Sequence, residues 1–147
     1  TGAAGSTGLS GATGPAGPVF PYNSTHSSLS VITTSTSWVA MPEMAVNIKL
    51  TTPSTLIIMF SSEAYLAATG NYLMVQARIN STLLAYPDTG NLFLTRATNV
   101  ESSSYSYTFN RPNVSADTYT ITIEWSVYSA GTGYVGDRTL TVMALPA

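Results

Sequence analysis

The sequence predicts an all-β fold, an antiparallel β-sandwich or jelly roll, preceded by a short segment that lies outside it. Three observations carry this prediction. Glycine recurs at every third position over the first 19 residues, apolar and polar residues then alternate over several segments, and clusters of turn-forming residues separate these segments. Alternation with a period of two is typical of half-buried strands, and no segment keeps the period of an amphipathic helix.

The opening segment has a strict glycine period. The glycines are Gly2, Gly5, Gly8, Gly11, Gly14 and Gly17. When three polyproline-II-like chains wind together, every third residue meets a crowded axis where only glycine fits, whereas a flexible linker has no reason to keep phase. Residues 1–19 are therefore predicted to form a collagen-like triple-helix stub built from three chains, with these six glycines on its axis.

This stub is too weak to align three chains by itself. Its prolines, Pro15 and Pro18, follow glycine directly, so the position that hydroxyproline stabilises in animal collagens holds none, which favours a bacterial or viral source. Six triplets span only about 50 Å at roughly 3 Å per residue. The register must then come from the rest of the chain, which we divide into a polar connector at 20–30 and a head at 31–147.

The head is predicted from strand and turn signals. Apolar and polar residues alternate over residues 46–51, 72–79, 104–109, 119–127 and 139–144. Turn-forming residues cluster at 52–54, 69–71, 87–90, 110–113 and 130–133. Strands of this length and spacing are typical of a sandwich or jelly roll.

Two strands are apolar on both faces. Residues 56–60 read Leu-Ile-Ile-Met-Phe, and residues 143 and 145 add Met and Leu to the outward face of the last strand. An antiparallel sheet normally leaves one face to water, so this second apolar face needs a cover. A neighbouring subunit would provide it, which makes Ile57, Met59, Met143 and Leu145 the candidate trimer interface. A long loop of the same chain is the alternative cover.

Composition excludes several partners. Only 8% of the residues are charged, against about 25% in an ordinary protein, and the net charge is −2. Nucleic acid and anionic membranes are therefore not expected as partners, and no apolar run approaches the roughly 20 residues that span a bilayer. The chain has no cysteine, so a disulfide framework is excluded. We expect it to be the C-terminal part of a longer protein whose targeting segment precedes Thr1.

The inventory of reactive side chains predicts a protein that is not an enzyme. His26 is the single histidine, and the seven carboxylates are isolated along the chain, so no catalytic pair, metal site or cofactor site is signalled. Sugar binding is the better rival, because Trp38, Tyr105 and Tyr107 could stack on a glycan. Burial of these aromatic residues in the core or in a subunit interface is the other interpretation.

The order of a glycine-repeat stalk and a C-terminal β head resembles the collagen-like proteins of bacteria and phages. It is similar in architecture to C1q, to tumour necrosis factor-like heads and to the spore-surface filament proteins of bacilli, and residues 136–142 look like a terminal strand of such heads. The resemblance implies a homotrimer on a cell or spore surface, or on a virion fibre. It supplies no calcium site that can be carried over to this sequence.

The function expected from these observations is structural. The head would hold three chains together, register the triple helix and cap a collagen-like surface filament. The alternative is an adhesin, the tip of a cell-surface or phage tail fibre that binds a glycan or a surface receptor.

Overall fold

The computed structural model describes residues 1–3, 11, 13–14, 17, 19–67, 72–88, 92–95 and 103–147. In these residues the chain forms strands and no helix. The strands are β1 (Tyr22–Ser27), β2 (Val31–Thr33), β3 (Val39–Lys49), β4 (Ser54–Ala67), β5 (Tyr72–Ile79), β6 (Leu83–Leu84), β7 (Leu92–Thr95), β8 (Ser103–Val114), β9 (Thr118–Val127) and β10 (Thr132–Pro146).

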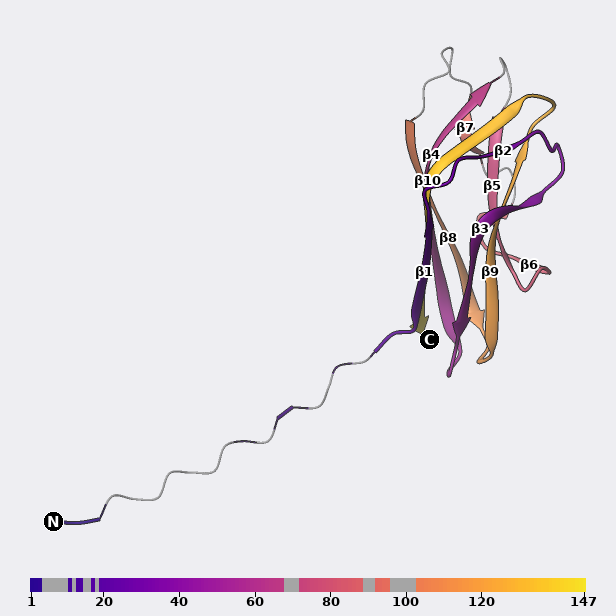
Figure 1. The fold of residues 1–147 in the computed structure, drawn as a ribbon. Coiled ribbons are helices and arrows are strands. Elements are labelled where there is room, and N and C mark those ends of the chain that lie inside the picture. Colours follow the sequence, from indigo (N-terminus) through magenta and orange to yellow (C-terminus); the bar gives the residue numbers. More distant parts are fainter. Residues whose placement is uncertain are drawn as a thin grey trace.

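The strands form two antiparallel sheets that face each other (Figure 1). The first sheet has the order β1-β10-β4-β8, with β2 also paired to β10, and the second has the order β3-β9-β5-β6, with β7 also paired to β5. The chain crosses between the sheets repeatedly, because β3, β4 and β5 fall in alternating sheets and so do β8, β9 and β10. This strand order is that of a jelly roll, so the predicted all-β antiparallel fold is confirmed.

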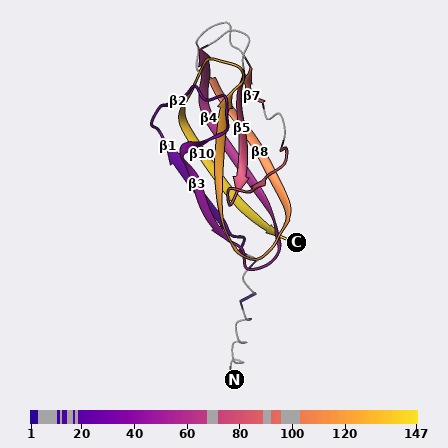
Figure 2. The same ribbon diagram turned by 90° about the vertical axis from the view of Figure 1, so that its right-hand side faces the viewer.

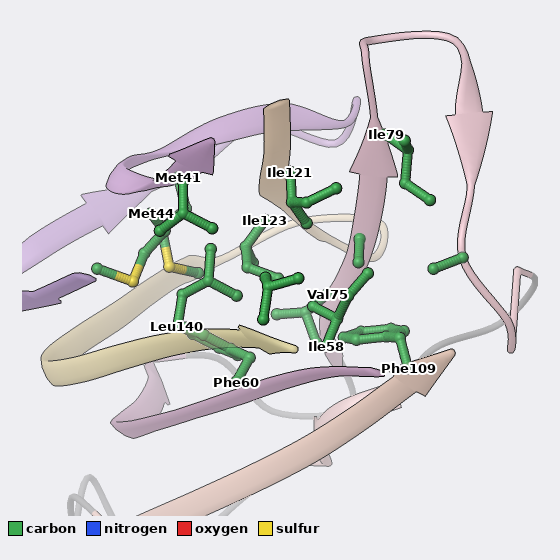
Figure 3. Close-up of a cluster of buried hydrophobic side chains, with 14 of the residues drawn as sticks. Met41, Met44, Ile58, Phe60, Val75, Ile79, Phe109, Ile121, Ile123 and Leu140 are labelled. Carbon is green, nitrogen blue, oxygen red and sulfur yellow. The ribbon is translucent and has the colours of Figure 1, made fainter. Parts of the chain in front are cut away.

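The core fills the space between the two sheets (Figure 3). Ile58 and Phe60 of β4 point inward from the first sheet, and Val75 and Ile123 point inward from the second. Every second residue of β4 from Ser54 to Leu66 is buried, as the period of two requires. Trp125 on β9 is 1% exposed and belongs to the same core.

Two features of the fold differ from the sequence prediction. The range 20–30, expected to be a polar connector, contains β1, which pairs along its whole length with β10. The turn expected at residues 110–113 is wrong, because these residues belong to β8. A strand at the margin of a sheet accepts proline, and Pro112 lies beside a register shift opposite Ser54 and Leu56.

The remaining turn predictions have mixed outcomes. Residues 52–53 and 130–131 connect strands as predicted, whereas Thr132 and Gly133 already belong to β10. Residues 69–71 and 89–90 lie outside the described residues.

The start of β1 and the C-terminus lie at the same end of the sandwich. In both views the chain enters β1 at the lower end, where β10 also finishes (Figure 2). The backbone N–H of Ala144 donates a 2.9 Å hydrogen bond to the carbonyl oxygen of Pro21. This bond ties the start of the head to β10 in the first sheet.

Candidate functional site

The four residues predicted as a trimer interface lie together on the outward face of the first sheet. Met143 of β10 is paired with Ile57 of β4, and Thr141 is paired with Met59. Met59 is 36% exposed and Leu145 is 40% exposed, while Ile57 and Met143 are half-buried by their neighbours. We call Ile57, Met59, Met143 and Leu145 the outer patch.

The sheet positions around the outer patch carry no charge. Tyr22 of β1 is paired with Met143 and is 70% exposed, so its ring extends the apolar surface toward the glycine-repeat segment. The other flanking positions are Ser24, Thr55, Thr108, Asn110 and Thr141. A surface of this kind can be covered by another protein surface without the cost of burying a charge.

Four of the six repeat glycines lie among the described residues. At Gly2, Gly11, Gly14 and Gly17 an added Cβ atom would meet no other heavy atom within 4 Å. Gly5 and Gly8 lie outside the described residues. The packing of a single chain therefore gives no steric reason for glycine at these four positions.

The three candidate glycan contacts do not lie on one surface. Tyr105 and Tyr107 project from the inward face of β8, where both pack against the core and the Tyr107 ring lies 4.8 Å from that of Phe109. Trp38 is half-buried and directly precedes β3. β8 and β3 are margins of different sheets, β3 next to β1 and β8 next to β7, so the structure does not bring Trp38 together with the tyrosines.

The carboxylates of the described residues are used in structural contacts or are isolated. Glu124 accepts hydrogen bonds from the buried Gln76 and from Arg78, whose Nε lies 2.9 Å from its carboxylate. No group of three His, Asp or Glu residues in the described part of the chain could hold a metal ion. His26 is exposed on β1.

Among the described residues, Arg138 is the fully buried charged side chain. It is 0% exposed, and its partners come from other segments of the chain. Its guanidinium donates to the carbonyl oxygens of Leu29 and Pro42 and lies 3.5 Å from the carboxylate of Glu43. Burial lowers the pKa of Arg138, and the negative charge of Glu43 opposes this shift.

Comparison with known proteins shows no family for this chain. No protein-family model matches the chain, and no curated protein matches it. One of the solved structures that match is that of the Eiger TNF from S. frugiperda, with a TM-score of 0.37 and 9% sequence identity over 86% of this chain and 95% of that one. The jelly-roll assignment rests on the strand order of this chain itself.

Within the described ranges, no helix is long and apolar enough to cross a bilayer.

The structure also forms a site that the sequence analysis missed. A hollow of about 340 Å³ lies between β6, the end of β8 and the following turn, and Tyr86, Arg111, Asn113, Ser115 and Tyr119 are among its lining residues. We call it the Arg111 hollow. Because residues 110–113 were expected to form a turn, nothing in the sequence pattern placed Arg111 beside Tyr86. The backbone of Tyr86 in fact exchanges two hydrogen bonds with Asn110, of 2.7 and 2.8 Å.

Proposed function

We propose that this chain is a non-enzymatic trimerisation head that registers and caps a collagen-like filament outside the cell. The observation that carries the proposal is the position of the outer patch. The patch is uncharged, partly exposed and next to the point where the glycine-repeat segment enters the fold. We propose that the patch is covered by two further copies of this chain.

The glycine period supports a complex of three copies. Glycine is not required at the described repeat positions by any contact within one chain. A triple helix requires it at every third residue, because the side chain there would meet the other two chains. Contacts among three chains therefore explain a glycine pattern that contacts within one chain do not explain.

The head can also set the register of the three chains. Three heads joined through the outer patch would hold three copies of Phe20 at one level, because the Pro21–Ala144 hydrogen bond fixes the start of each head. Winding of the stub then becomes an intramolecular step with a high effective concentration. We propose that the triple helix starts at Val19 and winds away from the head.

The first prediction concerns the assembly state. Residues 1–147 should have three times the chain mass of 15.5 kDa in multi-angle light scattering at micromolar concentration. We expect a trimer rather than a dimer because glycine at every third residue is required where three chains wind together. A monomer or a dimer at this concentration would contradict the proposed function.

The second prediction concerns the stub. Gly11→Ala should weaken the triple-helix signal in circular dichroism and expose residues 1–19 to protease, because a methyl group does not fit the helix axis. The matched control is Thr13→Ala, at a position that points away from the axis, and it should leave both readouts close to wild type. In both variants the melting of the head should stay unchanged, because an added Cβ at Gly11 contacts nothing in its own chain. Equal effects of the two substitutions would show that the segment is not a triple helix.

A further inference from the structure

The Arg111 hollow has the size and lining of a small-molecule site. Its volume of about 340 Å³ falls at the lower end of the range found for ligand sites, about 300–1,000 Å³. The lining combines two tyrosine rings, one guanidinium, an amide and a hydroxyl. Polar groups that converge on a concave surface are what fixes the orientation of a bound ligand.

Arg111 is held in place before any ligand arrives. Its Nη1 donates a 3.2 Å hydrogen bond to the carbonyl oxygen of Leu84, and its Cζ lies 4.7 Å from the centre of the Tyr86 ring. These contacts come from β6 and the residues after it, so they fix the guanidinium against the wall of the hollow. A guanidinium has five N–H donors, and the contact with Leu84 occupies one of them.

The charge of Arg111 is not matched by a carboxylate. Arg78 and Arg138 form ion pairs with Glu124 and Glu43, whereas no ion pair of Arg111 is found among the residues that the structure describes. None of the described residues that line the hollow is acidic. A fixed, half-buried cation with free donors is complementary to a carboxylate, which matches its planar fork.

The tyrosines add a surface for a sugar ring. Tyr86 is 42% exposed, and Tyr119 is half-buried with its hydroxyl 3.0 Å from the Oγ of Ser115. Tyrosine offers an apolar ring face and a polar rim, the combination that suits a pyranose with its apolar C–H face and hydroxyl edge. The Asn113 amide and the Ser115 hydroxyl, both exposed, are further partners for sugar hydroxyls.

We propose that the Arg111 hollow binds a sugar that carries a carboxylate, such as a terminal uronic acid of a glycan. Arg111 receives the carboxylate, and Tyr86 and Tyr119 border the ring. The site lies within one chain and does not depend on the trimer. It adds recognition of an acidic glycan to the structural role proposed above.

The test measures binding of methyl β-glucuronide to the full chain by NMR titration. Wild-type protein should bind it at least about tenfold more tightly than methyl β-glucoside, which carries a hydroxymethyl group in place of the carboxylate. Arg111→Ala should weaken binding about 10- to 100-fold, the range for a lost charge-assisted hydrogen bond. Arg111→Lys should recover only part of the affinity, because an ammonium keeps the charge and loses the fork.

Controls separate this site from simpler explanations. Lys49→Ala removes an exposed cation from β3 and should leave the affinity unchanged. Each variant should melt within a few degrees of wild type. Tyr119→Phe loses only a hydroxyl, so in the intact fold it tests whether that hydroxyl contributes to glucuronide binding. Acetate or inorganic phosphate binding as tightly as the glucuronide would overturn the proposal, because it would show an anion site without sugar recognition. Equal binding of glucuronide and glucoside, or no binding of either, would also overturn it.

Discussion

Replacing Arg138 with methionine is expected to lower the free energy of unfolding of the head by about 3–6 kcal/mol, which is about 1.5–3 kcal/mol for each of two carbonyl groups that lose a charged donor. Arg138 is fully buried, and it donates to the carbonyl oxygens of Leu29 and Pro42. Methionine fills part of the volume and donates no hydrogen bond, so both carbonyl groups lose this donor. Denaturant unfolding followed by tryptophan fluorescence measures the loss, because the buried Trp125 reports on the core.

The effect should be much smaller at the partner of this arginine. The Glu43 side chain is 52% exposed and lies 3.5 Å from the guanidinium, so water screens their attraction. We therefore expect Glu43→Gln to cost about 1 kcal/mol or less. The carbonyl hydrogen bonds, rather than the ion pair, are then the main stabilising contacts of Arg138.

Lys49→Met is the matched control for Arg138→Met. Lys49 is an exposed cation at the end of β3, and surface changes of this kind usually stay within about 0.5 kcal/mol. If Arg138→Met were as mild as Lys49→Met, the buried cluster would contribute nothing to the stability of the head. If Glu43→Gln were as costly as Arg138→Met, the ion pair would dominate, against our expectation.

The sequence predicted the layers of this fold because hydrophobic burial leaves a period in a strand. Val75 and Ala77 on β5, and Ile121 and Ile123 on β9, are buried in the alternating pattern that the sequence contains. The doubly apolar β4 was recognised in the same way, and the structure places its outward residues beside Met143. Such patterns lie within single strands, so the sequence of one chain is enough to detect them.

Contacts between distant segments could not be predicted in this way. Arg138 meets Pro42 across 96 positions of the chain. The alternation that includes Leu140 and Val142 places residue 138 on the inward face of β10, but nothing near it indicates which groups its guanidinium contacts. The Arg111 hollow likewise depends on Tyr86 and Asn110, which pair through an isolated bridge between the segment after β6 and β8. Turn propensity at residues 110–113 gave the wrong answer, because the position of β8 at a sheet margin removes the usual cost of proline in a strand.

Met59→Glu combined with Met143→Glu is expected to convert the proposed trimer into a folded monomer. Both methionines lie in the outer patch, and together the substitutions would place two carboxylates from each copy in a surface that excludes water. A buried charge without a partner costs several kcal/mol, and three copies multiply this cost. Light scattering should fall from three chain masses to one at micromolar concentration. Circular dichroism should keep the β signal of the head, because both side chains face outward.

Val39→Glu is the control for this loss of assembly. Val39 on β3 is 37% exposed, close to the 36% of Met59, and lies in the other sheet, so it measures the effect of a new surface charge away from the outer patch. A monomer in both variants would indicate that charge in general, rather than the outer patch, disperses the protein. A trimer that survives the double substitution would place the subunit contact elsewhere. The outer patch lies next to the entry of the segment whose glycine period we propose to require three chains, whereas Val39 lies in the other sheet.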